Sequence, residues 1–225
     1  MERLCITSYL AHGHSFRLHA YDELSNVPTG VEMVDASLSI PRDRIWKYSN
    51  GSLAGFANEY RYKSLFDGGV WVDMDTVCLK PLEFSSDVVI SSEVQPKGGK
   101  HMGFSLVKFS PNHPVIESCY NDCLRLGKPR CNFGTTGPKL LAKHVARYNL
   151  EHCVVDPVFY NPVWWKNADR FVTKEPHPIS EKTIVVHLYA ETWRRTNRDK
   201  NGTFPKTSNY EVWKNRFGVT TENLG

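Results

Sequence analysis

The sequence shows no strong excess of charge and no long apolar run. Its 225 residues include 28 Lys and Arg against 24 Asp and Glu, a formal net charge of +4. Nucleic-acid-binding domains usually carry a clustered basic face, so we expect no nucleic-acid partner. No apolar stretch approaches the roughly 20 residues that span a bilayer, and no signal peptide is visible at the start. We therefore expect no integral membrane segment.

Several metal and nucleotide signatures are also absent. None of the six cysteines forms a CxxC pair, and no zinc-binding spacing emerges. The sequence contains no Walker-type loop and no additional acidic cluster. Glycosylation sequons at Asn50 and Asn201 would matter only in a secretory compartment. We expect a reducing, cytoplasmic setting with free thiols.

Strand-like and helix-like segments alternate along the chain, which predicts an α/β fold. We expect a single GT-A-like domain over residues 1–225, with a mixed, mostly parallel central sheet flanked by helices. Residues 192–207 are expected to form a mobile polar segment. The expected helices are 2–11, 53–66, 114–126, 138–148 and 210–217, and the expected strands are 16–21, 70–72, 87–91, 103–109, 153–159 and 183–189.

The most informative segment runs from Phe56 to Asp75. A helix pattern ends at Gly68-Gly69 and is followed by a short apolar strand and the pair Asp73 and Asp75. Residues two apart on a strand face the same side, so both carboxylates would point into one pocket. Two close carboxylates repel one another, and a divalent cation such as Mn²⁺ or Mg²⁺ would compensate their charge. A lone Asp-x-Asp is also common in solvated loops, and only the surrounding pattern raises its significance.

Two polar residues lie on the helix before this pair. Asn58 and Arg61 are three positions apart and therefore share a helix face. An amide and a guanidinium on one face can bind a sugar hydroxyl and a phosphate together. For Arg61 alone, the alternative is a surface ion pair.

The segment 56–75 resembles the sugar-binding region of the DXD-containing glycosyltransferases, the group related to the yeast initiating mannosyltransferase and to the clostridial glucosylating toxins. In that family, a helix carries an acidic or amide residue and an Arg three positions later. Gly-Gly, a short aromatic-containing strand and Asp-x-Asp follow. The resemblance is dense over this segment and weaker over most of the chain. It implies a GT-A fold, a nucleotide-sugar donor, Mn²⁺ dependence and retention of the anomeric configuration.

The resemblance also implies a role for each residue of the segment. Asp75 would bind the metal directly, Asp73 would bind the donor's ribose or sugar and help to hold the metal, and Arg61 would contact the transferred sugar. These three are the expected catalytic residues. Asn58 stands where many members have Asp, which keeps a hydrogen-bonding group but removes a charge. Family members usually open with a strand that contacts the base, whereas this chain opens with a helix pattern, so the domain would lack its usual first strand.

Residues later in the chain extend the expected site. His187 ends an apolar strand and is the candidate third metal ligand, with Glu191 as a competitor. A core histidine bonded to backbone is an equal alternative for His187. By similarity to the family, Trp193 would close over the donor, and Thr136 and Gly137 would contact it. For Thr136 and Gly137, a plain loop with a helix cap is the alternative.

The densest basic run lies near the C-terminus and has two interpretations. It is either a solvated loop or a contact for a diphosphate or an acceptor. The basic run consists of Arg194, Arg195, Arg198 and Lys200.

His101, elsewhere in the chain, is assigned no chemistry.

These features predict a metal-dependent glycosyltransferase. It would move a hexose or N-acetylhexosamine from a UDP- or GDP-sugar donor to a hydroxyl of a glycan or another acceptor. The first alternative is a catalytically inactive relative that binds a nucleotide-sugar or carbohydrate, which Asn58 favours. The second is a metal-dependent nucleotidyltransferase or phosphohydrolase, because these enzymes also use paired aspartates.

Overall fold

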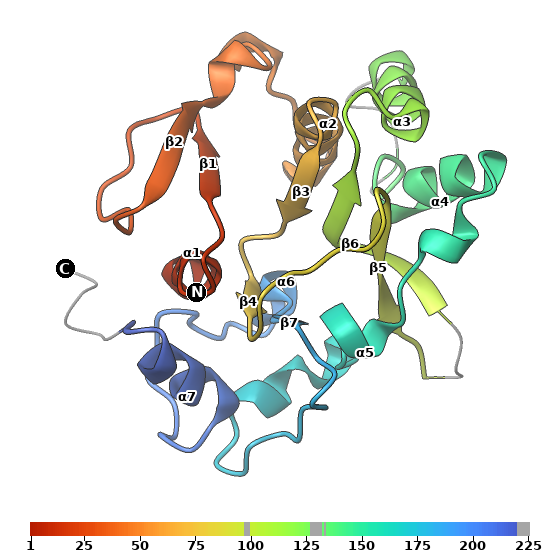
Figure 1. Ribbon diagram of the computed structural model, residues 1–225. Helices are drawn as coiled ribbons and strands as arrows, with labels where there is room; N and C mark the ends of the chain where they lie inside the picture. Colours follow the sequence, from red (N-terminus) through yellow and green to blue (C-terminus); the bar gives the residue numbers. More distant parts are fainter. Residues whose placement is uncertain (97–99, 127–131, 133, 220–225) are drawn as a thin grey trace.

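The computed structural model describes residues 1–96, 100–126, 132 and 134–219. Helices and strands alternate in one α/β unit, as the sequence predicts (Figure 1). The α-helices are α1 (Glu2–Leu10), α2 (Ala54–Leu65), α3 (Pro114–Arg125), α4 (Pro138–Arg147), α5 (Pro157–Tyr160), α6 (Ala190–Arg195) and α7 (Asn209–Arg216), and the strands are β1 (Phe16–Ala20), β2 (Val31–Asp35), β3 (Gly69–Val72), β4 (Thr76–Cys78), β5 (Val89–Val94), β6 (Lys100–Phe109) and β7 (Val185–His187).

The central sheet is antiparallel, and the expectation of a mostly parallel sheet is wrong. Its strand order is β3-β6-β5, with both β3 and β5 antiparallel to β6. The chain passes from Val94 to Lys100 in too few residues for the crossover that parallel neighbours require, whereas antiparallel neighbours need only a short connection. Among the described strands, only β1 and β2 pair in parallel, in a separate two-stranded sheet (Figure 1).

A third small sheet joins distant parts of the chain. β4 pairs with β7 in antiparallel register, with Thr76 opposite His187 and Cys78 opposite Val185. Thr76 and Val77 are fully buried, and so are Val185 and Val186. Because β4 follows directly after the Asp73–Asp75 turn, this pairing brings the end of β7 to that turn.

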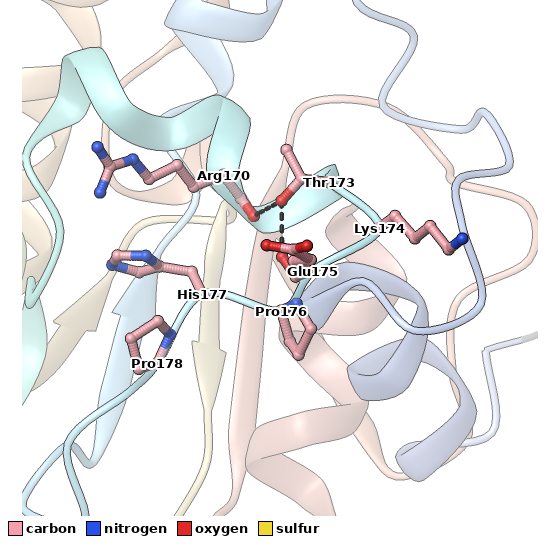
Figure 2. Close-up of a pocket in the computed structure, with 7 residues that line it drawn as sticks. All are labelled: Arg170, Thr173, Lys174, Glu175, Pro176, His177 and Pro178. Atoms are coloured by element: carbon pink, nitrogen blue, oxygen red, sulfur yellow. Dashed lines mark hydrogen bonds between the residues drawn. The ribbon is translucent and has the colours of Figure 1, made fainter.

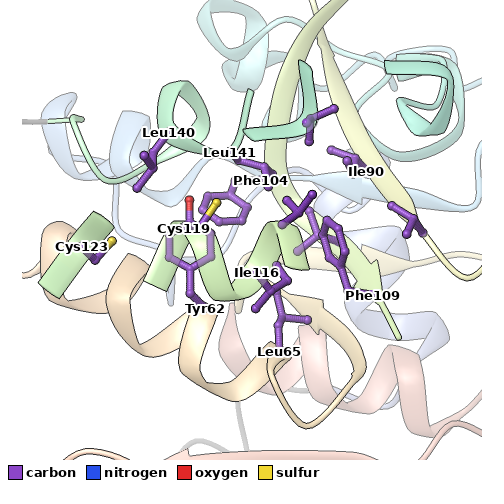
Figure 3. Close-up of a cluster of buried hydrophobic side chains, with 14 residues drawn as sticks. Tyr62, Leu65, Ile90, Phe104, Phe109, Ile116, Cys119, Cys123, Leu140 and Leu141 are labelled. Atoms are coloured by element: carbon purple, nitrogen blue, oxygen red, sulfur yellow. The ribbon is translucent and has the colours of Figure 1, made fainter. Parts of the chain in front are cut away.

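The first hydrophobic cluster lies between the central sheet and the helices α2, α3 and α4 (Figure 3). Pro114 and Pro138 stand at the first turns of α3 and α4, where a missing N–H has no cost. Tyr62 and Leu65 from α2 meet Cys119 from α3 and Leu141 from α4 there. The C-terminal half of α2 is thereby held against the sheet, and this fixes where the helix delivers its polar residues.

A second cluster fills the C-terminal part of the molecule. Val77 and Val186 from the small sheet pack with Trp193, Tyr210 and Phe171. Trp193 is 1% exposed, and its ring lies 5.0 Å from that of Tyr210. α6 and α7 are therefore anchored by aromatic side chains against the sheet that carries His187.

One local expectation needs correction. The segment 153–159 is not a strand: Asp156 caps a short helix whose first residue is Pro157, with the Val158 amide donating to the Asp156 carboxylate at 3.0 Å. A proline with a preceding cap residue favours a helix start even within an apolar run. The segment 192–207 begins inside α6, and its expected mobility stays a prediction.

The structure tests in part the expected absence of a membrane segment and the expected free thiols. No helix among the described residues is long and apolar enough to cross a bilayer. Cys5, Cys78, Cys119 and Cys153 are free, and Cys131 lies outside the described residues. All but Cys153 are buried.

Candidate metal and donor site

The chain enters the site through a glycine turn after α2. Gly68 has φ +82°, a conformation that side-chain-bearing residues rarely adopt. A Cβ there would also lie 2.7 Å from the Pro111 ring. β3 follows, and its pairing with β6 extends one step further when the Asp73 amide donates to the Ser105 carbonyl at 2.8 Å. The position of Asp73 is therefore set by the sheet.

Buried polar groups hold the turn that follows Asp73. The Thr76 hydroxyl donates to the Asp73 carbonyl at 2.8 Å. That hydroxyl also lies 3.1 Å from the Tyr9 hydroxyl of α1, and Cys5 of the same helix contacts the Asp73 carbonyl at 3.5 Å. Helix α1 therefore supports the turn from its buried side.

Asp75 and His187 meet across the pairing of β4 and β7. The Nε2 of His187 lies 3.2 Å from Oδ1 of Asp75. The second carboxylate oxygen accepts from the Ala190 amide at 2.7 Å. Tyr189 stands at φ +57°, which turns the chain back so that Ala190 reaches Asp75. Both oxygens of Asp75 therefore have partners in this structure.

Asp73, Asp75 and His187 converge on one point. Each residue offers a ligand atom, and the three atoms lie within 4.8 Å of one another. No other group of this kind occurs in the part of the chain that the structure describes. Two carboxylate oxygens and one imidazole nitrogen suit a divalent cation such as Mn²⁺. The donor set therefore fits the expected metal, and it includes all three residues predicted to hold it.

The pKa values of Asp75 and His187 move apart. Burial alone would raise the pKa of Asp75, but His187 and the amide hydrogen bonds lower it to about 2. Burial alone would lower the pKa of His187, but the Asp75 carboxylate, and to a lesser degree Asp73, raises it. Without a metal, the two side chains stabilise each other as an ion pair.

Arg61 binds the other aspartate. Its Nη2 lies 2.5 Å from Oδ1 of Asp73, and the Trp71 indole N–H donates to the same oxygen at 2.9 Å. The guanidinium stacks on Phe104 at 4.0 Å and on Trp71 at 5.0 Å. Since both donors use Oδ1, the second oxygen of Asp73 has no partner among the described residues.

Asn58 lies in a polar chain beside Arg61. Its amide oxygen is 3.5 Å from Nη1 of Arg61, and its amide nitrogen donates to the Thr136 hydroxyl at 3.3 Å. The Tyr48 hydroxyl lies 3.0 Å from the same hydroxyl. A Cβ on Gly137 would come within 3.2 Å of the Asn58 amide, so this loop packs closely on α2. The structure thus brings together Asn58, Arg61, Thr136 and Gly137 as expected.

The remaining predicted residues lie elsewhere. Trp193 is a core residue in this structure and is not exposed to a donor. Glu191 is bound by Arg194 and Arg195, each at 2.8 Å, and is not part of the metal group. Arg198 stacks over Trp193 at 5.6 Å. Lys200 pairs with Glu2 of α1, so every member of the basic run is engaged within the protein.

Sequence reasoning missed three residues. Trp71 is two positions before Asp73, and strand periodicity was a signal that they share a face. Tyr48 and Glu93 carry no local signal, because their neighbours in the site are distant in sequence. Glu93 is half-buried, and burial raises its pKa.

A shallow groove of about 490 Å³ lies outside this site. It contains none of the metal-group residues and is open to solvent. It is lined by the side chains in Figure 2, which are Arg170, Thr173, Lys174, Glu175, Pro176, His177 and Pro178.

No protein-family model matches this chain, and no curated protein matches it either. What the chain does must therefore be judged from its own residues. The geometry above offers three converged metal-ligand atoms, a stacked arginine on one of the aspartates, and an amide–hydroxyl chain beside it.

Proposed function

We propose that this chain is a metal-dependent glycosyltransferase. It transfers a hexose or N-acetylhexosamine from a UDP- or GDP-sugar to a hydroxyl group of a glycan or another acceptor. The observation that supports this most is the convergence of Asp73, Asp75 and His187 within 4.8 Å, next to the Arg61–Asp73 pair.

The three ligand residues would hold one divalent cation. Such a cation neutralises the charge that develops on a departing diphosphate. Mn²⁺ is the expected ion, with Mg²⁺ as the alternative. Asp73 has one oxygen bound by Arg61 and Trp71, so its other oxygen would be available to the cation or the donor. Asp75 and His187 would both act as ligands of the cation.

Arg61 and Asn58 would bind the sugar end of the donor. Arg61 is 7% exposed and held by two aromatic rings, so its guanidinium is oriented before a ligand arrives. The Asn58–Thr136 pair offers both a donor and an acceptor to sugar hydroxyls. Retention of configuration is part of this proposal and comes from the family resemblance alone.

The first test is release of nucleoside diphosphate from a panel of UDP- and GDP-sugars with Mn²⁺. Release is expected to require the metal and to fall at least about a hundredfold in Asp75→Ala, which corresponds to roughly 3 kcal/mol of lost transition-state stabilisation. Asp87→Ala is the matched control, because the Asp87 side chain is 90% exposed. Full activity of Asp75→Ala, or release without a divalent cation, would contradict the proposal.

A binding protein without turnover is the second candidate. Asn58 supports it, since an amide replaces the charge that many family members carry there. It predicts that the folded chain binds Mn²⁺ and UDP or GDP but releases no diphosphate from any donor. Release of pyrophosphate or phosphate would instead indicate attack at phosphorus, as in a nucleotidyltransferase or phosphohydrolase.

We place the reaction in a reducing, cytoplasmic setting. Cys5, Cys78, Cys119 and Cys153 are free thiols, which is the state that such a compartment maintains. Nucleotide-sugar donors are anionic, and the net charge of +4 is compatible with them. Once a donor is known, the same assay repeated with a panel of hydroxyl acceptors would identify the acceptor class.

A further inference from the structure

Glu93 is a half-buried carboxylate near the metal group, but it is not part of that group. It lies on β5 directly opposite His101 of β6. No hydrogen bond or ion pair joins its carboxylate to any residue that the structure describes, unlike Asp73 and Asp75. Its carboxylate oxygens are not among the fully buried polar atoms, so a polar ligand can reach them.

Gly103 shows the direction in which the Glu93 side chain points. A Cβ on Gly103 would lie 3.3 Å from Cγ of Glu93. The side chain therefore leans along the sheet from position 101 toward position 103. Ser105 is the next residue on that face, and its carbonyl binds the Asp73 amide. The absence of a side chain at Gly103 leaves room for the Glu93 side chain on the face of β6 that leads to Ser105.

The charges around Glu93 agree with this geometry. Burial raises its pKa and the Asp73 carboxylate adds to the rise, whereas His187 and His101 oppose it. The pKa of Tyr189 is also raised, first by burial and then by Glu93 and Asp75. Glu93 thus shares its surroundings with the two ligands Asp75 and His187.

The partner that Glu93 lacks is a neutral hydrogen-bond donor. A second cation beside the first would meet only one additional carboxylate, and a phosphate would be repelled. A hydroxyl group donates to a carboxylate without adding charge. In the proposed reaction, the attacking hydroxyl must approach the sugar while the diphosphate leaves.

We infer that Glu93 binds the attacking hydroxyl of the acceptor and accepts its proton, an inference that rests on the proposed glycosyltransferase function. The hydroxyl oxygen forms a bond to the anomeric carbon, on the face from which the diphosphate departs so that configuration is retained, as the bond from that carbon to the diphosphate oxygen breaks. The electron pair leaves with the diphosphate, and the proton moves to the Glu93 carboxylate. Water can take the place of the acceptor, which gives slow hydrolysis of the donor.

The test uses Glu93→Gln, which preserves shape and removes the charge. With Mn²⁺ and the donor sugar nucleotide alone, water is the acceptor. Release of nucleoside diphosphate is expected to fall by about a hundredfold to ten-thousandfold, the range for loss of a general base. Mn²⁺ affinity, measured by paramagnetic resonance of the free ion, is expected to stay within about twofold. Thermal stability is expected to be retained or raised, since a buried charge is removed.

Glu117→Gln is the matched control, because Glu117 is exposed on α3. Full release by Glu93→Gln would overturn the inference and leave the glycosyltransferase proposal intact. A large loss of Mn²⁺ affinity in that variant would also overturn it, because Glu93 would then be a metal ligand. If the unaltered protein binds Mn²⁺ but releases nothing from any donor, both the function and the role of Glu93 fail together.

Discussion

Asp75 and His187 are the residues whose chemistry depends most directly on pH. Each holds the other in its charged form at a contact of 3.2 Å. A metal ion needs the neutral imidazole, so metal binding must displace the proton that Asp75 helps to retain. The same contact that stabilises the metal-free site therefore competes with the metal.

We predict that Mn²⁺ affinity rises with pH up to the raised pKa of His187. The limit for one displaced proton is about tenfold per pH unit. Isothermal titration between about pH 6 and 8 measures this slope. His187→Gln is expected to bind Mn²⁺ more weakly and with a flatter pH dependence. An affinity that is independent of pH in the unaltered protein would contradict this account.

The metal-free protein should show the reverse trend in stability. The His187 contribution is fully present below its unfolded pKa, about 6.5, and is lost as pH rises through the folded value. The Asp75 contribution is present above its unfolded pKa, about 3.9, and is lost as pH falls toward about 2. Melting temperatures without metal should therefore decrease from pH 6 to 9, less so in His187→Gln.

Among the elements, α2 carries Asn58 and Arg61, the residues proposed to bind the donor sugar. The segment around Trp46 and Tyr48 packs on the N-terminal turn of α2 at Gly55. The Trp46 indole donates to Glu59 at 2.8 Å, and Tyr48 reaches Thr136. The absence of a side chain at Gly55 lets this segment lie close enough to join α2 to the Thr136 loop.

We predict that Gly55→Ala destabilises the fold by about 1–3 kcal/mol, since the added methyl would overlap the Trp46 ring. In an exposed helix position, the same change usually stabilises by up to about 1 kcal/mol, so the sign is informative. Urea denaturation gives the free energy of unfolding. Ala57→Gly, at an exposed position of α2, is the control that measures the effect of helix propensity alone on the free energy of unfolding. A stabilised Gly55→Ala would mean that Trp46 does not lie on the helix.

The sequence predicted some elements well and others poorly. The order of α2, Gly68-Gly69, β3 and the aspartate pair depends on local signals, and it is confirmed. The parallel sheet was wrong because strand direction is set by which distant strands pair, and local periodicity does not contain this. β2 was missed because its alternation is weak and charged residues interrupt it. Tyr48 and Glu93 join the site through contacts that no sequence spacing reveals.

At the scale of the whole molecule, the thiols report on the integrity of two hydrophobic clusters, the one in Figure 3 and a further one that contains Cys5 and Cys78. Cys119 and Cys123 lie inside the cluster of Figure 3, while Cys5 and Cys78 pack beneath the aspartate turn. Burial raises the pKa of Cys5 and of Cys78 to about 12, so neither forms the reactive thiolate.

We predict that iodoacetamide labels Cys153 in the folded protein before these four cysteines, because only Cys153 is partly exposed among the described ones. Peptide mapping by mass spectrometry measures each site. Labelling in denaturant, where all should react, is the control. Rapid native labelling of Cys119 or Cys123 would contradict the packing of α3 against the sheet.

The pairing of β4 with β7 has a consequence for how the protein is made. Ala190 and Asp75 are 115 positions apart, yet both help to complete one site. During synthesis, the ribosome releases the two aspartates long before the strand that carries His187. Contacts of such long range form late, after their loop-closure entropy has been overcome. A nascent chain therefore lacks one of the three candidate ligand residues until its last third emerges.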